Sequence, residues 1–219
     1  MDNETRKSNS REKIVGESLK LFSLKGFHNT SISDILAATG MSKGGFYNHF
    51  KSKEELFAAV LSEARKIWRL QNLADVDKPD RQIDKLKKIL TNYRDRYLKD
   101  AVHFPGGCVF ITLSVELDDQ LPHLSSQLSD GFERTKALLR KYLDRAREAG
   151  EIRPDVSTSD VSEILFSGIL GASVVYGMDK SDSQLSRNIQ ALIDYLGSIE
   201  QRNSSNKKRA TGRSIVDER

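Results

Sequence analysis

The sequence is short of several residue types, and each shortage excludes a class of protein. One cysteine among 219 residues rules out an internal disulfide framework and fits a reducing compartment. Only four prolines interrupt the chain, and no regular alternation of β-branched and polar residues predicts strands. The N-terminus lacks the apolar core of a signal peptide, and no apolar run approaches the roughly 20 residues of a membrane span. We therefore expect a cytoplasmic protein built from helices.

Motifs of common enzymes and metal sites are missing as well. The sequence contains no glycine-rich phosphate loop, GxSxG elbow, HExxH or CxxC, each of which carries a defined chemistry. His103, Cys108, Glu116 and His123 have no spacing that matches a compact set of metal ligands. We therefore expect no catalytic site, no metal and no cofactor. A helical enzyme that acts on a small molecule remains the alternative from another class.

The charged residues, 30% of the chain, are unevenly distributed. Residues 1–51 carry eight basic and five acidic side chains, a net charge of +3. The net charge is −3 for residues 52–201 and +4 for residues 202–219. A basic N-terminal part is compatible with binding to nucleic acid but does not establish it. Residues 202–219 have no apolar period, and we predict a disordered basic tail there.

The apolar spacing predicts helices almost throughout. Glycine or proline ends several of them, at Gly26, Gly40, Pro122 and Gly150, and a polar loop follows residue 73. We predict an all-α fold with helices over about 10–25, 31–39, 43–49, 52–73, 83–97, 110–121, 124–149, 159–177 and 183–200. The expected organisation is a flexible N-terminus (1–9), a first domain (10–57), a helical second domain (58–201) and the tail (202–219).

The most informative segment is SISDILAATGMSKGGFYNHF, residues 31–50. Gly40 provides a tight turn between two helices, and Ile35, Met41 and Phe46 provide the apolar contacts that hold the second helix against the first. Serines precede three helices as N-caps, at Ser31, Ser42 and Ser52. This pattern is typical of a helix-turn-helix.

The second helix of this motif has an unusual surface. Gly44 and Gly45 each destabilise a helix by about 1 kcal/mol relative to alanine, so a purely structural helix would avoid them. Their missing side chains allow the helix to approach another molecule closely. Hydrogen-bonding side chains surround this bare patch, namely Lys43, Tyr47, Asn48 and His49. Such a surface suits the major groove of DNA and the adjacent phosphates.

The order GF-x-x-TSI-x-DI, GMSKGG, FYNHF and KSKEEL resembles the DNA-binding domain of the tetracycline-repressor family over residues 10–57. The resemblance implies phosphate contacts by Thr30, Ser31, Tyr47, His49 and Lys53. It implies base or groove contacts by Ser42, Lys43, Gly44, Gly45 and Asn48. Leu36 and Gly45 depart from the residues that many members have, alanine at the first and threonine, serine or alanine at the second. At Gly45 one side-chain contact to DNA is therefore expected to be missing.

The family resemblance also implies a function and partners. It predicts a homodimeric repressor that binds a palindromic operator in double-stranded DNA. A small-molecule inducer in the C-terminal domain would release the operator. A transcriptional activator of the same family is the alternative.

Small residues in the C-terminal part predict a close helix contact. In the family the last two helices pair with their copies in a four-helix bundle. We therefore predict a dimer interface that contains Ser167, Gly168, Gly171, Ala172, Leu192 and Leu196. Ordinary packing within one chain is the alternative for each of these residues.

Cys108 lies at a predicted helix start, in PGGCVF. A helix N-terminus stabilises a thiolate, and some electrophile- and oxidant-sensing members of the family have a cysteine in a similar setting. Cys108 is therefore a hypothetical sensor of such an inducer. The alternative is a small residue buried in the core.

Overall fold

A computed structural model describes residues 3–117 and 121–201. This part of the chain is helical and contains no strand, which confirms the all-α prediction. The predicted basic tail, residues 202–219, lies outside the described residues. The elements are α1 (Asn3–Lys25), α2 (Ile32–Thr39), α3 (Lys43–Tyr47), α4 (Lys53–Asn72), α5 (Gln82–Asn92), the π-helix η1 (Tyr93–Tyr97), α6 (Val109–Leu117), α7 (Pro122–Glu148), α8 (Thr158–Asp179) and α9 (Asp182–Ile199).

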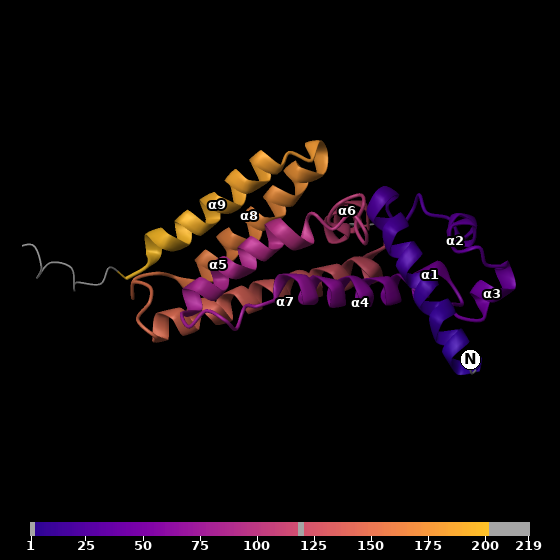
Figure 1. The fold of residues 1–219 in the computed structure, drawn as a ribbon, viewed down its shortest axis with the longest axis horizontal. Helices are drawn as coiled ribbons and strands as arrows, with labels where there is room; N and C mark the ends of the chain where they lie inside the picture. Colours follow the sequence, from indigo (N-terminus) through magenta and orange to yellow (C-terminus); the bar gives the residue numbers. More distant parts are fainter. Residues whose placement is uncertain (1–2, 118–120, 202–219) are drawn as a thin grey trace, which may run out of the picture.

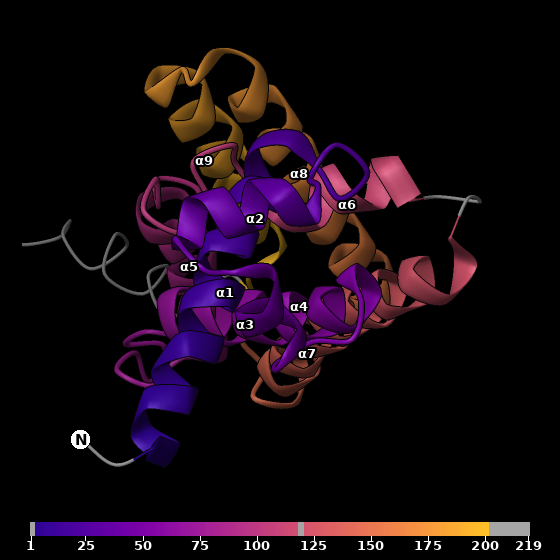
Figure 2. The same ribbon diagram turned by 90° about the vertical axis from the view of Figure 1, so that its right-hand side faces the viewer.

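The molecule is elongated, with α1, α2 and α3 gathered at one end (Figure 1). We call residues 3–57 the head and the other described residues the body. α4 begins in the head and continues into the body, and Figure 2 shows the helices of the head in front of those of the body. α1 packs on α4 and also on α6. The head therefore has two helical connections to the body, one through the chain and one through packing.

Aromatic packing holds the head together around the end of α1. The Phe27 ring lies edge-on to the rings of Phe22 and Phe57, with centroids 5.5 and 5.4 Å apart. Phe46 and Phe50, on either side of the end of α3, are also buried. The periodic apolar positions of the sequence thus form one continuous core.

Helix boundaries differ from the sequence prediction at three places. α1 begins at Asn3 rather than near Ser10, so the predicted start of the first helix is wrong. Charged helix formers can extend a helix without an apolar stripe, which is the signal that defined the predicted start. α3 ends at Tyr47, two residues before the predicted end. Pro122 begins α7 at its first turn, where the missing N–H has no partner in any case.

α8 is the one helix of the described part that is long and apolar enough to cross a membrane, by length and composition alone. The expectation that no segment reaches this limit is therefore wrong. Glycine, alanine and serine separate its large apolar residues, which makes the run less conspicuous in the sequence. Only 39% of its most apolar window is buried within the chain. The remaining apolar residues leave a second face uncovered.

Candidate nucleic-acid interface and ligand cavity

Residues 31–47 form two short helices that are joined by a tight turn. Gly40 ends α2 with φ 68°, a left-handed conformation that glycine adopts without steric cost. The Ser42 hydroxyl then accepts a hydrogen bond from the Gly45 N–H at 3.1 Å, and fully buried Phe46 fixes α3 to the core. The predicted turn, cap and anchor of the helix-turn-helix are confirmed.

The outer surface of α3 is bare at its glycines. A Cβ at Gly44 would meet no other atom within 4 Å, whereas one at Gly45 would lie 3.4 Å from Ser42 Oγ. Packing within the chain therefore gives no reason for glycine at position 44. Lys43 and Tyr47, which is 44% exposed, extend from the same short helix. The two glycines reduce the stability of the helix but leave its outer surface flat, and a flat surface is suited to close contact with a DNA groove.

Exposed polar groups flank this helix on two sides. Ser31 is exposed, although its hydroxyl both donates to Asp34 Oδ2 at 2.8 Å and accepts from the Asp34 N–H. The pKa of Asp34 is lowered to about 2. The largest cause is the hydrogen bond that its carboxylate accepts from the Ser31 N–H, and the next is the one from the Ser31 hydroxyl. Exposed Asn48 caps α3, with its N–H donating to the Gly44 carbonyl.

His49 is half-buried. Burial lowers its pKa, and the positive charges of Lys7 and Arg11 lower it further. These two basic residues of α1 lie near the helix-turn-helix, and sequence reasoning missed them. Their helical periodicity was the available signal, because it would have placed both side chains on one side of α1.

Two residues expected at the DNA do not lie on this face. The Thr30 side chain is fully buried, and its hydroxyl donates to the Gly26 carbonyl at 2.6 Å. Lys53 Nζ donates to the carbonyls of Phe27 and Thr30, at 2.8 and 2.9 Å, and lies 4.2 Å from the Phe27 ring centroid. Carbonyl groups of the head thus bind the ammonium group at the start of α4. The full burial of Thr30 conflicts with a phosphate contact by its side chain, whereas the phosphate contact of partly exposed Lys53 stays a prediction.

The residues predicted at the dimer interface fall into two groups, and the first is engaged within one chain. Ala172 and Leu196 are buried within the chain, so these two interface contacts are wrong. Gly168 packs against Leu192, since a Cβ on the glycine would lie 2.6 Å from Leu192 Cδ2. Both residues therefore mediate the contact between α8 and α9 of one chain.

The second group of small residues remains on the surface. Ser167 and Gly171 are exposed on α8. Sequence reasoning missed three large apolar residues on the same helix that are also exposed, Ile164, Val174 and Met178. The spacing from Ile164 through Gly171 to Met178 is seven residues in each step, which places them on one face of the helix. This spacing was visible in the sequence, but it could not show which face the chain covers itself.

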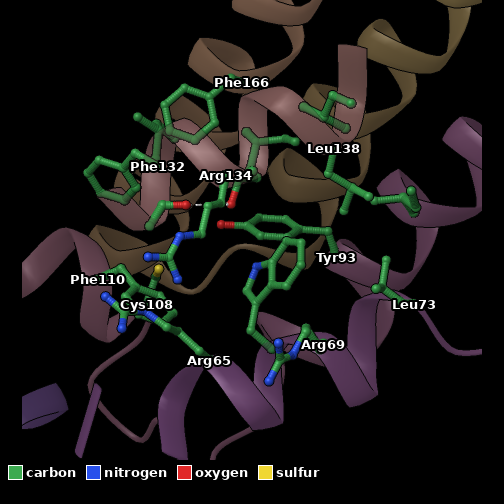
Figure 3. A pocket seen from close by; sticks show the side chains of 17 residues that line it. Arg65, Arg69, Leu73, Tyr93, Cys108, Phe110, Phe132, Arg134, Leu138 and Phe166 are labelled. Atoms are coloured by element: carbon green, nitrogen blue, oxygen red, sulfur yellow. Dashed lines mark hydrogen bonds between the residues drawn. The ribbon is translucent and has the colours of Figure 1, made fainter. Parts of the chain in front are cut away.

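A cavity of about 270 Å³ lies in the body between α4, α5, α6, α7 and α8. Aromatic side chains form much of its wall, and Figure 3 shows Tyr93, Phe110, Phe132 and Phe166 around it. Tyr93 is held in place because its hydroxyl pairs with Ser173 Oγ at 2.6 Å. The other lining residues are Arg65, Trp68, Arg69, Leu73, Ile89, Cys108, Gly131, Arg134, Thr135, Leu138, Leu139, Ile169 and Leu170. The cavity has the apolar character of a small-molecule site.

Cys108 lines this cavity at the start of α6 and is 9% exposed. Burial raises the pKa of its thiol, although the Tyr97 hydroxyl, 3.4 Å from Sγ, and the N–H groups of Ile111 and Phe110 act in the opposite direction. The expected stabilisation of a thiolate by the helix N-terminus is thus present but outweighed. The burial of Cys108 agrees with the alternative reading of a small residue packed in the core.

α6 and the turn before it connect the cavity to the head. At the end of α6, the Glu116 carboxylate accepts hydrogen bonds from the N–H groups of Phe27 and His28, both at 2.6 Å. At its start, Cys108 and Phe110 line the cavity. One helix of nine residues therefore contacts both the body's cavity and the end of α1.

The turn before α6 makes a second contact with α1. The Ser23 hydroxyl donates to the Gly107 carbonyl at 3.2 Å and accepts from the Gly106 N–H at 2.9 Å. A Cβ at Gly106 would lie 1.9 Å from the Ser23 carbonyl oxygen. Glycine is required here because the two backbones touch, a contact that the sequence alone did not show.

Comparison with known proteins agrees with this arrangement. The family described as bacterial regulatory proteins, tetR family, matches residues 14–60. The family described as tetracyclin repressor-like, C-terminal domain, matches residues 82–192, which is more than half of the chain.

Individual relatives extend over most of the chain. The HTH-type transcriptional repressor DhaR of Mycobacterium sp. strain GP1 is 26% identical over 186 residues, 85% of this chain and 91% of DhaR. A TetR transcriptional regulator from Chloroflexus aurantiacus superposes with a TM-score of 0.83 at 26% identity, over 90% of this chain and 98% of the other. A cysteine mutant of the regulator CifR, in complex with a 26-bp operator duplex, has the same fold at 17% identity and a TM-score of 0.73, over 84% and 94% of the two chains. The chain therefore belongs to the tetracycline-repressor family of DNA-binding transcriptional regulators.

Proposed function

We propose that this chain is a cytoplasmic repressor that binds a palindromic operator as a homodimer and releases it when a small molecule occupies the cavity. The observation that carries the ligand response is the position of α6, which lines the cavity and also holds the end of α1. A molecule that displaces Phe110 moves a helix whose other end is hydrogen-bonded to the head. Because a dimer must place two heads in matching grooves, a small rotation of each head releases the DNA.

The uncovered face of α8 supports the homodimer. Met178 is 83% exposed, and exposed apolar side chains in a row mark interaction surfaces. Exposed Gly171 in the middle of the row allows close approach of a second helix. The same face on two copies makes a two-fold interface, which accounts for an α8 that is apolar on both faces. We therefore place the interface at Ile164, Ser167, Gly171, Val174 and Met178.

The head supports binding to the major groove through α3. The side chains available to bases and phosphates are exposed at the start and end of this helix, with bare Gly44 between them. We propose DNA contacts by Ser31, Ser42, Lys43, Gly44, Gly45, Tyr47, Asn48 and His49. We assign Thr30 and Lys53 a role within the head, because both donate hydrogen bonds to carbonyl groups of the loop between α1 and α2.

A reaction at Cys108 is a second candidate for the signal. It is favoured by the position of the thiol in the cavity wall at the start of α6. The raised pKa of the buried thiol opposes it, since the thiolate is the reactive form. Reversible binding of a small molecule is therefore our primary proposal.

Footprinting on the DNA upstream of the chain's own gene tests the proposed function. We expect two protected half-sites, related by a two-fold axis, on one face of the duplex. Light scattering should give about twice the 24.7 kDa mass of one chain. A monomer in solution, or a single asymmetric protected site, would contradict the proposal. Deleting the gene should raise expression from that promoter, whereas a fall would identify an activator.

A further inference from the structure

Three arginines line the cavity, and no acidic side chain is among the described residues that line it. Arg65 and Arg69 come from α4 and Arg134 comes from α7. Figure 3 shows the two α4 arginines on one side of the cavity and Arg134 entering from the opposite side. Arg69 and Arg134 are exposed, whereas Arg65 is half-buried. The cavity thus combines an apolar interior with positive charge at its opening.

Among the described residues, no ion pair joins these three arginines to an acidic side chain. Glu63, on α4, pairs with Lys66, and Glu133, on α7, pairs with Lys136. Asp130 is close enough to Arg65 to raise its pKa, but burial and the charge of Arg134 have the larger, opposite effect and lower it.

Arg65 is also only partly hydrogen-bonded. Its Nη2 donates to the Gln127 carbonyl, while its Nε is buried and has no hydrogen-bond partner among the described residues. A Cβ at Gly131 would lie 3.7 Å from this Nε, so the small residue leaves space beside the unpaired donor. A half-buried guanidinium group whose Nε is buried without a partner favours an anionic ligand, and a planar carboxylate matches its geometry.

The size of the cavity limits the rest of the ligand. An engineered apolar cavity of about 150 Å³ holds benzene. By proportion, the 270 Å³ here accommodates roughly ten to twelve non-hydrogen atoms. Trp68 and Phe132 offer an aromatic wall to this part of the ligand. A longer molecule would have to extend past the arginines into solvent.

We propose that the cavity takes a hydrophobic monocarboxylate, whose carboxylate is held by Arg65 and Arg134 while its apolar part packs against the aromatic wall. This proposal names the ligand class for the proposed function. It rests on the proposed function only in the expectation that binding of the ligand releases the operator. A neutral molecule of the same shape would leave the arginines unpaired. Discrimination between an acid and its amide is therefore the property to measure.

The single tryptophan of the chain provides the signal, because Trp68 lines the cavity. The full-length protein, without DNA, is titrated with octanoate, decanoate and trans-cinnamate and with the primary amide of each. We expect at least one acid to change Trp68 fluorescence with a Kd below about 1 mM. The same acid should bind at least ten times more tightly than its amide, and calorimetry should give the same ratio. The proposal is overturned if no acid binds in this range or if the amides bind equally well.

Variants assign the discrimination to the arginines. Arg134→Met should remove the preference for the acid and leave the affinity for the amide unchanged. Because Arg134 is exposed, this variant should fold normally. Arg65→Met should do the same, with a melting curve to check that it folds. Arg140→Met is the matched control on α7, since Arg140 does not line the cavity and lies near Asp144. Equal loss of preference in the control, or an unchanged preference in Arg134→Met, contradicts the proposed site.

Operator release is measured separately, by fluorescence anisotropy of a labelled operator. An acid that binds the protein without releasing the operator contradicts the proposed function but supports the ligand class. Release by acid and amide at equal concentrations contradicts the ligand class and supports the proposed function. The two proposals can thus fail independently.

Discussion

Glycines in α3 and in α8 have opposite surroundings. At Gly44 an added Cβ would meet nothing within 4 Å, whereas at Gly168 it would lie 2.6 Å from Leu192 Cδ2. The first glycine is unexplained by its own chain and points to an external surface, while the second packs against a side chain of the neighbouring helix α9. A glycine in a helix can therefore indicate either contact with a partner or close packing within the chain, and only the tertiary contacts distinguish these two cases.

The largest effect is expected for Gly44→Leu, which tests the external surface. The new side chain fits in the isolated protein but prevents close approach of α3 to the groove. We expect at least a 100-fold loss of operator affinity, about 2.8 kcal/mol, with no fall in the melting temperature, because leucine favours a helix more than glycine does, and with an intact dimer. Anisotropy with operator DNA and a melting curve measure the two quantities.

Gly16→Ala is the control for this prediction. Gly16 also lies in a helix of the head with open space around its Cβ position, so alanine should stabilise the fold by about 0.5–1 kcal/mol. Operator affinity should not change. If Gly44→Leu binds the operator normally, the glycine surface of α3 does not face DNA.

Two substitutions in α8 separate internal packing from the dimer interface. Gly168→Ala should change the stability of the fold by less than about 1 kcal/mol, because the end of the Leu192 side chain can turn away from the methyl group while alanine favours the helix, and the protein should remain dimeric. Gly171→Glu should leave the monomer folded but dissociate the dimer, because a charge is buried in the interface. Denaturant unfolding and sedimentation measure these effects, and a Gly171→Glu dimer would exclude this face of α8.

The same contrast between exposed and buried positions governs two acids at helix starts. Asp34 in the first turn of α2 has a pKa lowered to about 2, whereas burial raises the pKa of Cys108 at the start of α6. Ellman's reagent at pH 7 should therefore react with Cys108 more than tenfold more slowly than with free cysteine. Faster reaction, together with loss of diamide-induced operator release in Cys108→Ser, would restore the sensor hypothesis.

The smallest effect is expected for Asp34→Asn. A carboxyl group with a lowered pKa stabilises the folded state above its ordinary pKa of 3.8, and this contribution is lost as the pH falls toward about 2. The variant should therefore melt slightly below the wild type at pH 7. The difference should shrink between pH 4 and pH 2. A difference that is independent of pH would assign the effect to something other than the charge of Asp34.

Local chemistry in the sequence determined much of the fold and of the head. The caps at Ser31 and Ser42, the left-handed turn at Gly40 and the apolar periods act within a few residues, so they can be predicted without knowing the rest of the chain. The π-helix η1 could not, because the apolar spacing through Tyr93 and Tyr97 is that of an ordinary helix.

The tertiary structure decided which of the predicted site residues are free to act. Thr30 is buried, Lys53 binds carbonyl groups of its own head, and Leu196 belongs to the core. The arginine-lined cavity joins residues of α4 and α7 that are more than 60 positions apart, such as Arg65 and Arg134. Burial and the pairing of charges depend on distant segments that meet only in the folded chain. The residue types and spacing therefore identified the family and the DNA-binding motif, whereas the exposed face of α8 and the chemistry of the cavity required the fold.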